Sequence, residues 1–412
     1  MNQNDIRILR ELASRVADLA GLPVQAEKRD MWKRLNALRP VRPMVLIDEI
    51  PWHEMDVDGF LKTQCEDPFL RRIEGGLRRT LYRWDHLRCD MVVEPYIEVP
   101  RAIDSTGFGI EKNEDTSITD QNNWIVGHHY KPQIETEEDL EKLVVPTLSE
   151  DKAENERRET LAREALGGIL DVRMTGMYVY STLWDTLVEW ITPEEVLIGV
   201  AERPEFLEAA MDKYVTVFEA MIDQAEHKNL LDDALTVSHC SYSYTYEDEF
   251  PRHKPGENVS ALNCWTDATA QLFGSISAAD HDRLEFQYIK RICARFGRVY
   301  YGCCEPLHDR MHLVRKLPNV RKVSCSPWCN IDIAAENIHG DFVAVNKPNP
   351  AWVAQETFDT DLIAADLRRT REACARNQTP LEYILKDIST VKYKPQRIWE
   401  WADIAMKTVL DG

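Results

Sequence analysis

Residues 300–309, YYGCCEPLHD, place two thiols, a carboxylate and an imidazole close together in the sequence. Cys303 and Cys304 are adjacent, Glu305 follows directly, and His308 lies three residues further on. Thiolate, carboxylate and imidazole groups are the usual ligands of zinc, and a carboxylate also carries protons in acid–base catalysis. We therefore predict that Glu305 is catalytic and that Glu305 and Cys304 are metal ligands.

The chain has ten cysteines and no secretion signal, which favours reduced thiols over a disulfide framework. A bond between Cys303 and Cys304 is disfavoured, because neighbouring Cα atoms lie about 3.8 Å apart, below the roughly 4.4–6.8 Å of most disulfides. Side chains alternate along a strand, so we expect one of these thiols to face the site and the other to face the helices. The alternative is that both serve as small buried hydrophobic residues.

His239 and Cys240 end the strand that we predict at 234–240. Histidine is a common zinc ligand, so His239 is expected to complete a metal site with Cys304 or Glu305. The alternative is a structural histidine held by hydrogen bonds.

Asp48 and Glu49 follow the first predicted strand, and Lys386 and Asp387 follow the last. These ends adjoin if the strands close into a barrel, so the four residues are expected to meet. We predict that Asp48 and Asp387 are catalytic, as proton acceptors or metal ligands, and that Glu49 contacts the substrate. The alternative is a salt bridge from Lys386 to one of these carboxylates.

Three further residues stand at or near strand ends and are predicted to bind the substrate. Trp328, in the segment CSPWC, offers an aromatic wall for a planar molecule, although it is also a candidate for simple loop packing. Tyr178 and Lys347 follow two other predicted strands. The C-x3-C spacing of CSPWC differs from that of zinc ribbons and indicates no metal site by itself.

Alternating strand and helix patterns must position these side chains. Eight strand candidates separated by helical patterns favour a (β/α)8 TIM barrel over an open, doubly wound sheet. Residues 1–40 are expected to form an N-terminal helical extension, and 41–412 the barrel domain with an excursion near 100–150. Active sites of such barrels lie where the strands end, so the many ionisable groups at these ends indicate an enzyme. The predicted strands are 43–49, 91–99, 170–176, 234–240, 298–304, 321–325, 341–346 and 381–388.

Composition excludes several classes of function. The chain has 412 residues and a formal net charge of −20, which argues against nucleic acid and anionic membranes, because both require a cationic surface. The N-terminus is charged and helix-patterned, and no apolar run is long enough to span a bilayer, so a soluble cytoplasmic protein is expected. The glycine-rich patterns that cradle nucleotide phosphates are absent.

The order of strands and three segments resemble the uroporphyrinogen decarboxylase-like superfamily, over most of the chain from about residue 40. The segments are YYGCCEPL (300–307), FVAVNKPNPAWVA (342–354) and ILKDIST (384–390). The resemblance implies a TIM barrel with one of two activities. One branch holds porphyrinogen decarboxylases. The other holds corrinoid-dependent methyltransferases, which move methyl groups between a substrate or thiol and a cobalamin-binding protein, commonly with zinc.

Departures from the two family patterns favour the second branch. The decarboxylases carry an arginine-containing loop after the first strand, whereas this chain has Asp48 and Glu49, which would repel a substrate with many carboxylates. Thiol-methylating enzymes carry His-x-Cys after the fifth strand and a cysteine near the last. Here no histidine is in register with Cys303, and Asp387 stands where the second cysteine is expected.

The resemblance therefore implies a methyltransferase like the substrate-demethylating component of anaerobic O-demethylase systems. It would move a methyl group from a small methylated or methoxylated substrate to the Co(I) corrinoid of a partner protein, assisted by zinc. Formation of a homodimer stays open. The alternatives are a decarboxylase of the uroporphyrinogen decarboxylase type and a non-catalytic barrel that binds a small ligand.

Overall fold

The computed structural model describes residues 2–118, 120–123 and 125–411. The chain begins with two helices, α1 (Gln3–Ala20) and α2 (Pro23–Asn36), within the stretch where a helical extension was expected. The side chain of Asn2 caps α1 by accepting a hydrogen bond from the Asn4 N–H, and Pro23 occupies the first turn of α2. Helix α1 packs against α3 (Pro68–His86) and α4 (Lys152–Leu166), which join it to the rest of the fold.

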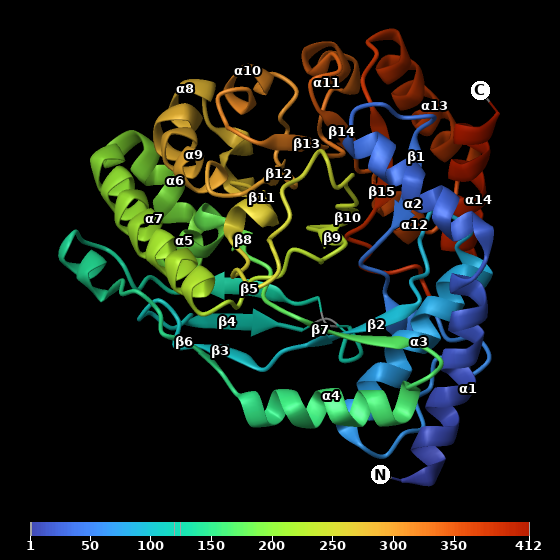
Figure 1. Cartoon of the computed structure of the whole chain (residues 1–412). Coiled ribbons are helices and arrows are strands. Elements are labelled where there is room, and N and C mark those ends of the chain that lie inside the picture. Colours follow the sequence, from blue (N-terminus) through green and yellow to red (C-terminus); the bar gives the residue numbers. More distant parts are fainter. Residues whose placement is uncertain (1, 119, 124, 412) are drawn as a thin grey trace.

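Seven strands form the central sheet in the order β1-β15-β14-β13-β12-β11-β8 (Figure 1). Every neighbouring pair is parallel, so each connection must cross over, and helices provide most of these crossovers. The chain therefore has an α/β fold with a parallel central sheet. The strands are β1 Met44–Ile47, β8 Tyr180–Ser181, β11 Trp265–Ala268, β12 Arg298–Tyr301, β13 Val320–Cys325, β14 Val343–Asn346 and β15 Leu381–Leu385.

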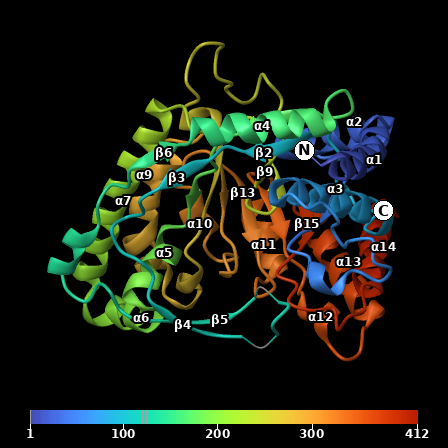
Figure 2. The same ribbon diagram turned by 90° about the horizontal axis from the view of Figure 1, so that it is seen from below.

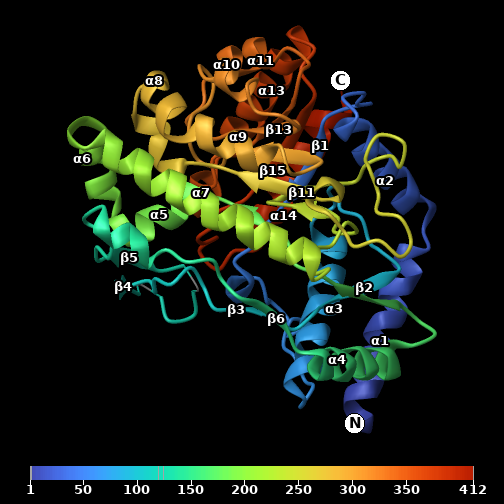
Figure 3. The same ribbon diagram turned by 60° about the vertical axis from the view of Figure 1, so that its left-hand side comes forward.

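Helices between the strands surround the sheet on its outer side, as Figures 1 and 3 show. Ser277 caps α8, and a π-helical turn, Asp282–Phe286, separates α8 from α9. Thr192 caps α6 by accepting a hydrogen bond from the Glu195 N–H. These helices are α5 Leu183–Ile191, α6 Pro193–Glu202, α7 Pro204–His227, α8 Ala278–His281, α9 Gln287–Cys293, α10 Met311–Val314, α11 Ile331–Ile338, α12 Ala351–Ala354, α13 Thr360–Arg376 and α14 Gln396–Leu410.

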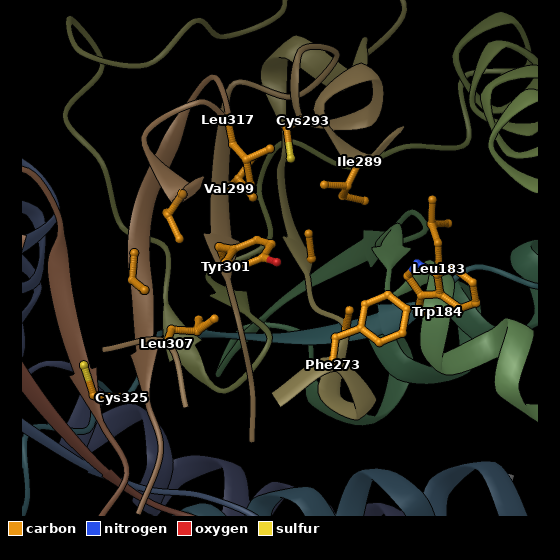
Figure 4. Packing of buried hydrophobic residues seen from close by; sticks show 14 of the residues in the cluster. Leu183, Trp184, Phe273, Ile289, Cys293, Val299, Tyr301, Leu307, Leu317 and Cys325 are labelled. Atoms are coloured by element: carbon orange, nitrogen blue, oxygen red, sulfur yellow. The ribbon is translucent and has the colours of Figure 1, made fainter. Parts of the chain in front are cut away.

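The largest hydrophobic core lies between the sheet and these helices. Val299 and Tyr301 of β12 face this layer and belong to one cluster with Cys293 and Leu317, as the close view in Figure 4 shows. Tyr300, between them, belongs to a second cluster with residues such as Ile384 on the inner side of the sheet. The alternation follows from strand geometry, because successive side chains point to opposite faces.

Within the described residues of the segment 96–175, six strands lie outside the central sheet. β2 (Tyr96–Pro100) and β7 (Asp171–Thr175) form a separate parallel pair. The expected excursion holds two antiparallel pairs, β3 (Ile103–Ser105) with β6 (Leu148–Glu150) and β4 (Glu114–Ser117) with β5 (Gly127–Tyr130). Figure 2 shows α4 running alongside β2 and β3.

Strand pairing in the described ranges does not complete a ring, because β1 and β8 are the edges of the seven-stranded sheet. The segment before β2 nevertheless lies beside β1, since the Asp90 N–H donates a 2.9 Å hydrogen bond to the Val45 carbonyl. The fold agrees with a TIM-barrel-like arrangement, and closure of a (β/α)8 barrel stays a prediction.

The strand predicted at 234–240 is wrong. That segment enters a short antiparallel hairpin, in which β9 (Val237–Ser238) pairs with β10 (Ser241–Tyr242). The strand that stands next to β12 in the sheet is β11, which the sequence pattern did not identify. His239 and Cys240 form the two-residue turn of the hairpin, and His239 has a φ of 55°, as such turns require.

The hairpin lies inside the curve of the sheet (Figure 1). The Cys240 Sγ is 3.6 Å from the Tyr300 hydroxyl on β12, and the Ser241 hydroxyl donates a 3.0 Å hydrogen bond to Glu382 on β15. Because one short hairpin contacts strands that are far apart in the sheet order, the sheet must bend around it.

Below the hairpin turn, Lys322 of β13, Glu382 of β15 and Ser241 form a buried polar group that we call the floor group. The Lys322 amine donates hydrogen bonds to the Ser241 hydroxyl at 2.6 Å, to the Tyr242 carbonyl at 3.0 Å and to Glu382 at 3.0 Å. All three side chains are fully buried. Every charge here has a partner, as a buried ion pair requires.

No helix of the described ranges is both long enough and apolar enough to cross a membrane.

Candidate functional site

The carboxyl ends of the parallel strands bring five polar residues together on the inner side of the sheet. We call them the rim cluster. Cys303 follows β12, Lys347 follows β14 and Lys386 follows β15, while Asp267 lies within β11 and His239 comes from the hairpin turn. Parallel strands end at one edge of a sheet, which explains why residues distant in sequence meet there.

Gly302 turns the chain from β12 into the cluster. Its φ of 90° is a conformation that favours glycine, and a Cβ there would lie only 2.5 Å from the Leu307 Cδ1. β12 ends at Tyr301, so Cys303 and Cys304 are not strand residues. The expectation that the two thiols face opposite sides is therefore wrong, and their sulfur atoms lie 3.7 Å apart.

Cys303 lies among positive charges. The Lys386 amine is 4.0 Å from the Cys303 sulfur, and the Lys347 amine donates a 3.1 Å hydrogen bond to the Cys303 carbonyl. A hydrogen bond from the Cys304 thiol lowers the pKa of Cys303, and Lys347, His239 and Lys386 act in the same direction against the effect of burial. Cys303 is therefore expected to be a thiolate at neutral pH, and a thiolate is a strong nucleophile.

Glu305 lies beneath this turn and is fully buried. One carboxylate oxygen accepts a 2.8 Å hydrogen bond from the Thr269 hydroxyl, and the other accepts a 2.9 Å bond from the Cys303 N–H. Burial raises the pKa of Glu305, although these bonds oppose the shift. The contacts suit a residue that holds the Cys303 turn against β11, and its predicted direct role in catalysis stays a prediction.

Asp267 is the residue that sequence reasoning missed most clearly. It is buried, and the His239 Nδ1 lies 3.7 Å from its Oδ2. Within the described ranges, neither of its carboxylate oxygens has a hydrogen-bond partner, and the same holds for the His239 Nε2. Burial raises the pKa of Asp267, so this carboxyl group retains its proton at higher pH than usual.

A second acidic residue that the sequence did not reveal is Asp185, near the start of α5. It accepts a 2.7 Å hydrogen bond from the Gln271 side chain, and burial raises its pKa to about 7. The charges of Glu305 and Cys303 act in the same direction. The sequence offered little indication of this site residue, because Asp185 lies within a helical pattern and not at the end of a predicted strand.

The residues predicted to meet at the ends of the first and last strands do meet. Lys386 forms an ion pair with Glu49 at 3.1 Å, and its amine is 3.6 Å from Asp387. Burial and a hydrogen bond shared with the Asp387 carboxyl group raise the pKa of Glu49 to about 7, against the effect of Lys386. Asp48 is half-buried directly after β1, and its N–H donates a hydrogen bond to the Leu385 carbonyl.

Three residues in or beside the rim cluster have strained backbone conformations. Glu49, His239 and Asp387 have φ angles of 47°, 55° and 56°, in a region of backbone conformation that residues other than glycine seldom adopt. Strained conformations gather at functional sites, because the surrounding fold must stabilise them.

The remaining predicted residues lie around the cluster. The Tyr178 hydroxyl forms a 2.7 Å hydrogen bond with Ser238 of the hairpin, beside Asp267. Trp328 follows β13 and exposes 69% of its surface, so it does not form part of the buried cluster.

The predicted zinc ligands do not form a metal site in this arrangement. Across residues 2–411, with 119 and 124 set aside, no group of three His, Cys, Asp or Glu side chains could hold a metal ion. Both oxygens of Glu305 accept hydrogen bonds, from the Thr269 hydroxyl and from the Cys303 N–H. We therefore derive no chemical step through zinc, and zinc binding stays a prediction of the resemblance.

No family model and no curated protein matches the chain. Among solved structures, a methyltransferase from Methanosarcina mazei has a similar fold, with a TM-score of 0.51 and 10% sequence identity. The similarity covers 92% of this chain and 98% of that chain. At this identity it shows the fold alone, which is the TIM-barrel-like arrangement that the strand order already indicates.

Proposed function

We propose that this chain is a methyltransferase that moves a methyl group from a small methylated or methoxylated substrate to the Co(I) corrinoid of a separate protein. The observation that carries the proposal is Asp267, a buried carboxyl group whose oxygens have no hydrogen-bond partner in the described ranges, near His239, two lysines and Cys303 at the strand ends. Burial raises the pKa of Asp267, which favours its protonated form. The fold shared with a methyltransferase of known structure adds support.

The difficult part of this reaction is the departure of the leaving group. When the methyl–oxygen bond of an ether breaks, the oxygen departs with the electron pair and leaves poorly unless it receives a proton. A Co(I) corrinoid supplies the electron pair that takes up the methyl group. The Asp267 carboxyl group donates the proton to the departing oxygen, and Lys347 and Lys386 offset the negative charge that develops nearby.

The thiolate of Cys303 has a supporting role in this scheme. Burial acts to lower the pKa of Lys386, and the negative groups around it, Cys303 among them, more than compensate. The same holds for Lys347. Cys303 therefore helps to keep two cations charged at the place where the substrate oxygen would lie, and Cys240 has the larger effect on the pKa of both lysines.

The corrinoid protein is expected to approach the strand ends from outside. Trp328 stands on the loop after β13, at this side of the sheet, and its large exposed ring offers an apolar contact for the partner or the edge of a corrinoid. A Trp328→Ala variant is expected to weaken binding of the corrinoid protein and leave the fold unchanged.

The test mixes the chain with a reduced corrinoid protein and a panel of methoxylated and methylated compounds, and follows the absorbance change that accompanies methylation of the corrinoid. Asp267→Asn should slow the reaction about 100-fold, the usual scale of general acid catalysis. The control is Glu11→Gln, because this residue is exposed on α1, which contributes no residue to the rim. Absence of transfer with every donor, or an Asp267→Asn variant as fast as wild type, contradicts the proposal. Metal analysis of the purified protein tests the zinc prediction separately.

A further inference from the structure

A cavity of about 660 Å³ lies apart from the rim cluster, between helix α3, the segment 91–100 and the β9–β10 hairpin. Its walls include none of the five rim residues. The volume is typical of a small-molecule site. The hairpin connects the two places, since Val237 and Tyr242 line the cavity while His239 reaches the rim.

The walls of the cavity are mainly apolar and aromatic. Phe69, Ile73 and Leu77 of α3 face Val92 and Val93 across it. Tyr96, Tyr242 and Tyr244 add aromatic surface. Such walls favour an organic molecule with an apolar body over an inorganic ion, because apolar surface is removed from water only by an apolar ligand.

Two arginines of α3 supply positive charge. Arg83 makes one hydrogen bond, at 2.7 Å to the Ile47 carbonyl, and Arg72 also lines the cavity. In the portion of the chain that the structure describes, neither arginine forms an ion pair, although many other arginines of this acidic protein do. A guanidinium offers five N–H donors, so Arg83 has most of its capacity free.

The acidic residues of the wall do not cancel this charge. Glu94 accepts two hydrogen bonds from Arg29 and one from the Tyr244 hydroxyl, which leaves it neutralised by Arg29. Glu98 is exposed, so solvent screens its charge, and partial desolvation together with the charge of Asp232 raises its pKa. Arg158 is paired with Glu154. The free charge facing the cavity is therefore that of Arg72 and Arg83.

We propose that this cavity binds a carboxylate with an apolar or aromatic body, its charged group on Arg83 and its body between α3 and the tyrosines. Arg72 lies about three turns away on the same helix, so it adds positive charge to the cavity but does not share the carboxylate. Planar guanidinium groups match the geometry of a carboxylate, and a half-buried arginine strengthens the contact. The site goes beyond the proposed methyl transfer, because it needs neither the rim cluster nor a corrinoid.

Gly76 provides a sharp test, because it lines the cavity and a Cβ built there meets no described atom within 4 Å. A large side chain can therefore enter the cavity without displacing its neighbours. Gly76→Phe is the filling variant, and Gly76→Ala, which adds one methyl group, is its control. Arg83→Gln removes the charge, and its control is Arg79→Gln on the same helix, outside the cavity wall.

Binding of benzoate, phenylacetate and octanoate to the full chain is measured by calorimetry, with the corresponding amides as uncharged counterparts. We expect at least one carboxylate to bind, its amide to bind at least tenfold more weakly, and Arg83→Gln to weaken binding by a similar factor. Gly76→Phe should abolish binding, while Gly76→Ala and Arg79→Gln retain it. Circular dichroism confirms that each variant is folded.

Three results would overturn the proposal. They are no carboxylate binding to the folded wild type, equal binding of acid and amide, and binding that Gly76→Phe leaves intact. If Cys303→Ser loses binding while Gly76→Phe retains it, the ligand binds at the rim, which also contradicts the proposal. The binding measurement involves no methyl transfer. A failure of the binding proposal can therefore be told apart from a failure of the proposed function.

Discussion

The rim cluster and the floor group lie on the same inner side of the sheet and are joined by one hairpin, but their polar groups are satisfied differently. At the floor, Lys322 makes hydrogen bonds to Ser241, the Tyr242 carbonyl and Glu382. At the rim, both oxygens of Asp267 and the Nε2 of His239 lack partners in the described ranges.

The comparison separates polar groups that stabilise the fold from polar groups that are available to bind a substrate. Buried polar groups are nearly always hydrogen-bonded, so unpartnered ones need a reason. A site that must bind and release a substrate has to leave some groups unsatisfied until the substrate arrives.

The largest expected effect is on the floor. Lys322→Met leaves the fully buried Glu382 without its charged partner, and removing one member of a buried pair typically destabilises a protein by about 3–5 kcal/mol. Chemical denaturation should show this loss. The double variant Lys322→Met with Glu382→Leu should recover most of the stability, because no charge remains buried. A single variant as stable as wild type would mean that the floor group is not structural.

A smaller effect of opposite sign is expected at the rim. Asp267→Asn removes a buried carboxylate with two unpartnered oxygens and should stabilise the protein by about 1–2 kcal/mol near pH 8. The folded pKa of Asp267 is raised above its ordinary value of 3.8, so the folded state binds the proton more tightly than the unfolded state. Wild-type stability therefore falls as pH rises from that value through the folded pKa.

The advantage of Asp267→Asn should consequently grow with pH and shrink towards about pH 4. Parallel denaturation of wild type and variant cancels the titration of all other groups. A variant that is less stable at every pH would show that Asp267 is a structural residue like those of the floor.

The smallest expected change in stability is that of Lys386→Met. Its partner Glu49 has 34% of its side chain exposed, so loss of the ion pair should cost less than about 1 kcal/mol after solvent screening. The same substitution removes a positive charge 4.0 Å from the Cys303 sulfur, and the pKa of Cys303 should rise by about 1–3 units. Lys392→Met, an exposed ion-pairing lysine, is the matched control. A large loss of stability without a change at Cys303 would contradict the division between rim and floor.

Much of the framework was predictable from the sequence, because buried parallel strands are short apolar runs. Strands were predicted at 43–49, 321–325, 341–346 and 381–388, and the structure confirms strands within these runs and shows that they are neighbours. The meeting of Glu49 with Lys386 was predicted as well, since it follows from the adjacency of the first and last strands.

The other features depend on contacts between residues far apart in the sequence, so the sequence pattern did not reveal them. The segment TVSHCSYSY has the residue types of a strand, and only its contacts with β12, β13 and β15 reveal it as a hairpin inside the sheet. β11 has the sequence WTDA, with a polar and a charged residue in four, so it lacks the apolar pattern of a buried strand. Asp267 was therefore missed with it. The sulfur contact of Cys303 and Cys304 depends on the φ of Gly302, which a sequence pattern does not show.

The central claim is that the rim holds a thiolate among cations at neutral pH. Ultraviolet absorbance distinguishes thiolate from thiol without requiring access to the buried sulfur, and the difference between wild type and Cys303→Ser across pH isolates Cys303. We predict that this difference is fully present at about pH 6, well below the ordinary thiol pKa near 8.5, and that Cys304→Ser does not remove it. A difference that appears only near the ordinary thiol pKa, or that is lost with Cys304 instead, would contradict the account.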